Sequence, residues 1–131
     1  MVIDTSALLA IALGEPSKGA LLDRIDAASR RLMSAVSLLE AGMILRSRKG
    51  NASVALLHEL VEGLGIELVP FEEVQARLAI TAFGRFGKGM GHRAQLNFGD
   101  CAVYALASSR GEPVLAVGND FAATDLAVLR G

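Results

Sequence analysis

Four acidic residues stand at positions where they could form a metal-binding site. The sequence MVIDTSALLAI contains Asp4, SAVSLLEAGMIL contains Glu40, LNFGDCAVYALA contains Asp100 and AVGNDFAATD contains Asp120. Carboxylates about 4 Å apart repel by roughly 4 kcal/mol at an effective dielectric constant of 20, so a cluster of them needs a cation or altered protonation. Hard divalent cations prefer such oxygen ligands. If the fold gathers these acids, we expect metal-assisted phosphodiester chemistry.

Each acid taken alone also has an ordinary structural explanation. Asp4 suits the N-cap of a helix, and Asp100 lies three residues after Asn97, which could cap the next helix. Ser37 and Glu40 have capping-box spacing. The fourth acid lies in a Gly-Asn-Asp turn sequence. These explanations leave open why the acids follow apolar strands and begin helices that must pack on the same sheet.

The order of the predicted elements indicates an α/β fold. We expect strands at 2–3, 32–35, 66–70, 114–117 and 127–129. We expect helices at 4–13, 16–25, 37–49, 51–64, 72–83 and 100–110. Alternating strands and helices predict a mainly parallel sheet of four to five strands flanked by helices. Ligands bind beyond the carboxyl ends of such strands, which is where the first and fourth acids follow their strands.

The composition favours one globular domain spanning residues 1–131. The chain is 52% hydrophobic with a net charge of −1, which argues against a polycation that coats nucleic acid. No apolar run approaches the roughly 20 residues that span a bilayer, and the N-terminus lacks a signal peptide's features, so we expect a cytoplasmic protein without a membrane segment. With one cysteine, Cys101, and two histidines far apart, a metal would have to be held by oxygen.

Four sequence blocks together resemble the PIN domain, and specifically the VapC toxins of type II toxin–antitoxin systems. They are MVIDTSALLAI, the lone glutamate of the third helix, LNFGDCAVYALA and VGNDFAATD, and their order extends over the full chain. The resemblance implies an endoribonuclease that uses Mg²⁺ or Mn²⁺, with Asp4, Glu40, Asp100 and Asp120 as its catalytic, metal-binding acids. We expect Asp4 and Asp100 to be direct ligands and the other two to act through water or at a second position.

Neighbouring polar residues are predicted to orient these acids. Thr5, Ser6 and Asn119 match positions that support metal-binding carboxylates. Asp125 lies five residues after Asp120 and could share or replace its role. The number of metal ions stays open.

RNA must reach an acidic site, so we expect cations at its rim. The candidates are Arg46 in a basic helix end and Arg85, Lys88 and Arg93 in or beside the glycine-rich segment 84–93, which we expect to be a mobile loop or frayed helix end. Arg93 stands where many relatives have proline. Hydrolysis by an activated water would leave 5′-phosphate and 3′-hydroxyl ends.

The resemblance also implies partners. We expect an RNA substrate, either transfer RNA or ribosomal RNA, whose cleavage inhibits translation, a cognate VapB-type antitoxin, and a homodimer. The alternative is a catalytically silent PIN-like module that only binds proteins. A haloacid dehalogenase phosphatase is excluded because Ser6 stands where it needs a second aspartate, and a receiver domain would need an acidic pair and a lysine that the motifs lack.

Overall fold

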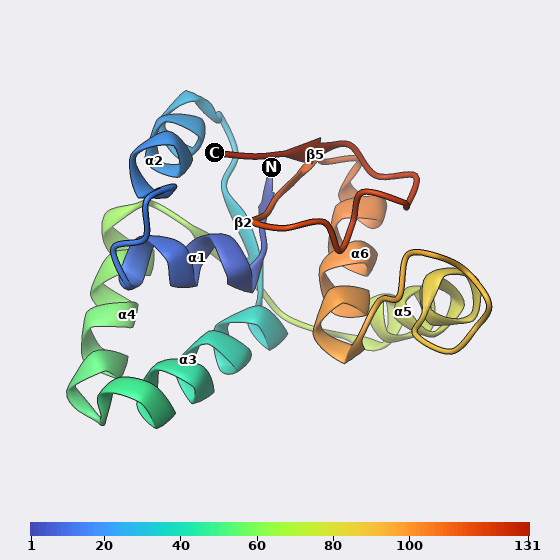
Figure 1. Cartoon of the computed structure of the whole chain (residues 1–131), viewed down its shortest axis with the longest axis horizontal. Coiled ribbons are helices and arrows are strands. Elements are labelled where there is room, and N and C mark those ends of the chain that lie inside the picture. The colour runs from blue at the N-terminus through green and yellow to red at the C-terminus, as the bar shows by residue number, and fades with distance from the viewer.

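The computed structural model describes residues 1–131 and contains one five-stranded sheet flanked by helices (Figure 1). The strands are β1 (Val2–Ile3), β2 (Leu32–Ser34), β3 (Glu67–Val69), β4 (Val114–Leu115) and β5 (Val128–Leu129). The helices are α1 (Thr5–Ala12), α2 (Lys18–Ala27), α3 (Ala35–Lys49), α4 (Ala52–Gly63), α5 (Glu73–Phe86) and α6 (Phe98–Arg110). The predicted α/β fold is therefore confirmed.

All strand pairs are parallel, and the strands lie in the order β3-β2-β1-β4-β5. The chain runs outward from β1 to β3 on one side and then returns to β4 on the other side of β1. The order therefore reverses between β1 and β4, which is where ligands bind in open parallel sheets. The end of β1 is tied to β4 by a hydrogen bond of 2.9 Å from Asp4 N to Leu115 O.

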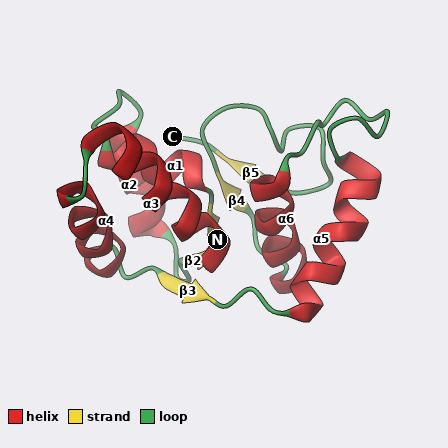
Figure 2. Ribbon diagram, turned by 90° about the horizontal axis from the view of Figure 1, so that it is seen from below, coloured by secondary structure: helices red, strands yellow, loops and turns green.

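The sheet is covered on both faces, which explains why its strands are apolar without alternation. Successive side chains of a strand point to opposite faces. Accordingly, Ile3 packs in a core with α1 to α4, whereas its neighbour Val2 packs in a second core with α5 and α6. Figure 2 shows these two groups of helices on opposite sides of the sheet. None of the helices has the length and apolar character needed to cross a membrane.

The third helix begins earlier than predicted. Ser34 occupies its N-cap, and the Ser34 side chain accepts a hydrogen bond of 3.2 Å from Val36 N. The proposed capping box between Ser37 and Glu40 is therefore wrong, because both residues lie inside α3. Ser34 caps the helix because it ends β2 with an extended backbone, which is the conformation typical of an N-cap.

Other helix ends differ in smaller ways. Asn51 occupies the N-cap of α4 but its side chain makes no capping hydrogen bond; instead Ser53 Oγ donates to Gly50 O at 2.6 Å. The structure extends α5 to Phe86, beyond the predicted end at 83. The predicted stop of α6 at Gly111 is confirmed, since this residue has the left-handed conformation that glycine adopts readily.

Candidate acidic active site

Asp4 is fixed at the end of β1, where it caps α1. Its side chain is buried, with the residue 6% exposed, and Oδ2 accepts a hydrogen bond of 3.0 Å from Ser6 N and another from Ser6 Oγ. Ser6 Oγ also accepts a hydrogen bond of 3.0 Å from Val117 N. Ser6 thus links Asp4 to the chain that leaves β4. Thr5 contacts α3 instead, because its Oγ1 donates to Ser37 O at 3.3 Å.

Asp100 holds the start of α6 in a reciprocal capping box. Asn97 Oδ1 accepts a hydrogen bond of 2.9 Å from Asp100 N, and Asp100 Oδ2 accepts one of 3.0 Å from Asn97 N. The residue is 7% exposed. The predicted capping role of Asn97 is confirmed. The capping box uses only Oδ2 of Asp100, and Oδ1 makes no hydrogen bond.

Glu40 reaches from α3 to the first turn of α6, where it lies against Gly99. A Cβ atom added at Gly99 would stand 2.6 Å from Glu40 Oε2, so only glycine allows this close approach. The contact brings Glu40 next to the residue that precedes Asp100. Sequence reasoning missed the role of Gly99, although a glycine directly before the acid of LNFGD was the available signal.

Asp120 and Asp125 have different surroundings. Asp120 is exposed in the loop after β4 and forms no hydrogen bond or ion pair, and Asn119 contributes its carbonyl to a turn with Ala122 N at 3.0 Å. Asp125 instead accepts a hydrogen bond of 2.7 Å from Tyr104 OH. This bond comes first among the causes that lower the pKa of Asp125. The structure thus separates Asp125 from the other acids.

The four remaining acids influence one another electrostatically. Burial raises the pKa of Asp4, partly offset by its hydrogen bonds to Ser6, and the charges of Glu40 and Asp120 raise it further. For Asp100, burial is again the largest cause, and with the charges of the three other acids it raises the pKa to about 7 despite the hydrogen bond from Asn97. The charges of Glu40 and Asp120 therefore act on both buried aspartates, and this repulsion favours either protons or a cation at Asp4 and Asp100.

The donor set suits a hard cation. All four side chains offer carboxylate oxygen, the ligand type of Mg²⁺ and Mn²⁺. The buried side-chain oxygens without a partner are Ser37 Oγ and Gln75 Oε1, so the second oxygens of Asp4 and Asp100 reach the surface. No three His, Cys, Asp or Glu side chains stand close enough to hold one ion as they are. Binding would therefore draw the carboxylates together, which the partial exposure of Glu40 and the exposure of Asp120 allow.

The predicted rim cations lie outside this acidic cluster. Arg46, Lys88 and Arg93 are exposed and form no ion pair, whereas Arg85 NH1 lies 3.3 Å from Asp125 Oδ2. The first three residues of the glycine-rich segment 84–93 belong to α5, and the rest forms a loop. Hydrogen bonds of 2.9 Å from Lys88 N to Leu96 O and from Leu96 N to Phe86 O close the base of this loop.

Comparisons with known proteins agree with this architecture. The PIN domain family profile matches residues 1–126. Ribonuclease VapC28 of Mycobacterium tuberculosis is 46% identical over 124 residues, which cover 95% of this chain and 93% of that protein. The chain therefore belongs to the PIN-domain family, within its group of VapC ribonucleases.

Solved structures show the same fold at low sequence identity. Mycobacterium tuberculosis VapC20, described as a toxin that cleaves the sarcin–ricin loop, superposes with a TM-score of 0.77 at 19% identity, covering 99% of this chain and 98% of VapC20. VapBC-1 from nontypeable Haemophilus influenzae gives 0.77 at 16% identity, covering 98% of this chain and 96% of that one. These similarities support the fold, while the family assignment rests on the sequence matches.

Proposed function

We propose that this chain is a metal-dependent endoribonuclease, the toxin of a VapBC-type pair, with Asp4, Glu40, Asp100 and Asp120 as its catalytic and metal-binding acids. The observation that carries the proposal is that Asp4, at the end of β1, and Asp100, in the first turn of α6, are buried with one oxygen free of hydrogen bonds. The charges of Glu40 and Asp120 raise the pKa of both. Its support is the membership of the chain in a family of named ribonucleases.

In this proposal the four acids have two tasks. Asp4 and Asp100 hold the ion directly through the oxygens that their capping hydrogen bonds leave free. Glu40 and Asp120 complete the site directly or through water. Bound Mg²⁺ or Mn²⁺ would polarise a phosphate and lower the pKa of an attacking water. Attack by water predicts 5′-phosphate and 3′-hydroxyl ends.

RNA would be held by cations around the acidic site, because the acids themselves repel phosphates. We propose Arg46, Lys88 and Arg93 for this role, since all are exposed and free of ion pairs. Arg85 also belongs to this set, although its guanidinium is paired with Asp125. The substrate class is transfer RNA or ribosomal RNA, and its cleavage would inhibit translation in the cytoplasm.

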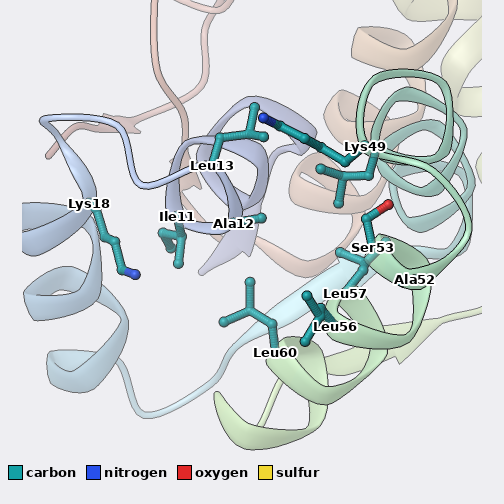
Figure 3. A pocket seen from close by; sticks show the side chains of 11 residues that line it. Ile11, Ala12, Leu13, Lys18, Lys49, Ala52, Ser53, Leu56, Leu57 and Leu60 are labelled. Carbon is teal, nitrogen blue, oxygen red and sulfur yellow. The ribbon is translucent and has the colours of Figure 1, made fainter.

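A VapB-type antitoxin would need an apolar surface on the toxin, and the groove between α1, α2 and the ends of α3 and α4 offers one. The groove has a volume of about 500 Å³ and is mostly apolar (Figure 3). Leu56 and Leu60 of α4 line it, and Lys18 and Lys49 lie at its border. Because Leu56 is 65% exposed in the isolated chain, covering it would favour binding. We therefore propose this groove as the antitoxin's docking surface.

We also propose a homodimer. Val74 and Ile80 on α5 and Phe98 at the start of α6 are 69%, 72% and 82% exposed. Ile80 and Phe98 line one apolar pocket, the kind of contiguous surface that a partner covers. Sedimentation equilibrium tests this proposal: Ile80→Glu should convert a dimer to a monomer, whereas Thr81→Glu, an exposed neighbour, should not. A monomeric wild type would contradict it.

The decisive experiment incubates the purified protein with total cellular RNA and Mg²⁺ or Mn²⁺, and maps the cut ends. We expect discrete cuts with 5′-phosphate ends that disappear with EDTA and in Asp4→Asn, while Asp23→Asn, an exposed acid of α2, cuts normally. Cutting that persists in EDTA, or 2′,3′-cyclic phosphate ends, would contradict the metal mechanism. A folded wild type that binds antitoxin but cuts no RNA would favour the silent binding module.

A further inference from the structure

Asp125, which stands apart from the acidic site, joins three segments of the chain. Its Oδ1 accepts a hydrogen bond of 2.7 Å from Tyr104 OH on α6, and its Oδ2 lies 3.3 Å from Arg85 NH1 near the end of α5. Asp125 itself belongs to the segment between β4 and β5. These contacts form a clamp, defined here as Arg85, Tyr104 and Asp125.

Tyr104 is the member of the clamp that packing in the core holds in place. Tyr104 is 8% exposed and packs in the second core, with its ring centroid 5.5 Å from that of Phe86. The Arg85 guanidinium lies over the same Phe86 ring at 4.5 Å. Because the Arg85 and Asp125 side chains are 62% and 52% exposed, water screens their ion pair. The hydrogen bond from buried Tyr104 therefore determines most of the position of Asp125.

Tight turns connect the clamp to the fourth acid of the site. Phe121 is buried at 1% exposure, and its carbonyl accepts hydrogen bonds from Thr124 N at 3.1 Å and Thr124 Oγ1 at 2.7 Å. A further turn joins Ala122 N to Asn119 O at 3.0 Å. The chain from 119 to 125 is thus a compact unit, so fixing one end restricts the other.

Asp120 has nothing within the acidic site to hold it there. It forms no hydrogen bond or ion pair, and the charges of Asp4 and Asp100 interact unfavourably with its own. An attachment outside the site must oppose this repulsion. We propose that Tyr104 and Asp125 are positioning residues that hold the loop of Asp120 against the acidic site, an inference that rests on the proposed function.

The test measures the affinity of the purified full chain for Mn²⁺ alone by calorimetry. In Asp125→Ala and Tyr104→Phe, we expect about tenfold weaker Mn²⁺ binding, as for other residues that orient metal ligands. RNA cleavage by Tyr104→Phe should show a reduced kcat with little change in KM, because this variant keeps the ion pair of Arg85 with Asp125. Asp23→Ala, an exposed acid on α2, should match the wild type in both measurements.

A second control separates positioning from general destabilisation. Val103→Ala removes buried methyl groups one residue from Tyr104, so it should lower the Tm without weakening Mn²⁺ binding. Tyr104 is the only tyrosine and the chain has no tryptophan, so its near-ultraviolet absorption band can be followed directly. Asp125→Ala should shift this band in the protein without Mn²⁺, whereas Asp23→Ala should leave it unchanged.

The outcomes distinguish this inference from the proposed function. Wild-type Mn²⁺ affinity in both clamp variants, in a protein that binds Mn²⁺ and cuts RNA, would overturn the clamp and leave the ribonuclease intact. Equal weakening by Val103→Ala would also overturn it, because loss of stability would then explain the effect. A wild type that binds no Mn²⁺ and cuts no RNA would overturn the proposed function, and the inference with it.

Discussion

The acidic site consists of two pairs of carboxylates that are held in opposite ways. Asp4 and Asp100 are buried, and each has one oxygen bonded within the first turn of its helix. Glu40 and Asp120 are more exposed and form no hydrogen bond or ion pair. The first pair is therefore rigid and the second adjustable. In the proposed site, helix capping would fix two metal ligands before the metal binds, and the adjustable pair would complete the site.

Substitution of the rigid pair should have the largest effect on activity. Asp4→Asn and Asp100→Asn remove a charge but keep an oxygen that can cap a helix. We expect RNA cleavage to fall by more than about 100-fold, beyond the usual loss for residues that only orient ligands. Single-turnover cleavage assays measure this, with circular dichroism to verify folding. Activity within a few-fold of the wild type would remove these residues from the catalytic machinery.

Asp100 of the rigid pair should also lower the free energy of unfolding above neutral pH. Because the pKa of Asp100 is raised to about 7, the folded state holds a proton between pH 4 and 7 that the unfolded state has released. The wild type should therefore lose stability as the pH rises through this window. A shift from 3.8 corresponds to roughly 4 kcal/mol, and because one oxygen reaches solvent we expect about half of that.

Asp100→Asn should accordingly be more stable than the wild type by about 2 kcal/mol at pH 8, with no difference below pH 4. Urea unfolding in EDTA at several pH values measures the gain. EDTA matters because a bound cation would cancel the repulsion. An Asn variant that is less stable than the wild type at pH 8 would show that the capping box of Asp100 outweighs its electrostatic cost.

Substitution of the adjustable pair should have a smaller effect. For Glu40→Gln and Asp120→Asn we expect a loss of about tenfold in cleavage, partly recovered at higher Mn²⁺, because these side chains complete a site that the rigid pair still holds. Titration of the cleavage rate with Mn²⁺ measures both quantities. Losses equal to those of the rigid pair, without recovery by Mn²⁺, would contradict the division into two pairs.

The smallest expected effect comes from displacing an acid without changing its charge. In Gly99→Ala the new methyl group would stand 2.6 Å from Glu40 Oε2 and push that carboxylate aside. We expect a several-fold loss of cleavage with a small change in Tm, since the displaced atoms end a flexible side chain. Gly19→Ala in α2, where a Cβ meets nothing within 4 Å, is the matched control and should retain full activity. Wild-type cleavage by Gly99→Ala would place Glu40 outside the reaction.

The sequence by itself determined the features that depend on neighbouring residues. Apolar runs predicted four to five strands, and their alternation with helices predicted a mainly parallel sheet. The capping box at Asn97 follows from contacts within one helical turn. Asp4 and Asp100 were visible for the same reason, because each lies at or within the first turn of a helix, whereas Glu40 lies inside α3 and was identified by the family resemblance. At the start of α3, the capping-box spacing predicted Ser37 as the cap, whereas the structure uses Ser34.

Only the tertiary structure decided which distant groups meet. Pairing of β1 with β4 places Asp4 beside the end of β4, and the close approach of Glu40 to Gly99 depends on how α3 packs beside α6. The two C-terminal aspartates also differ in their spatial surroundings, since Asp125 accepts a hydrogen bond from Tyr104, whereas the charge of Asp120 raises the pKa of Asp100. Sequence spacing cannot settle such contacts, because they arise from burying both faces of one sheet at once.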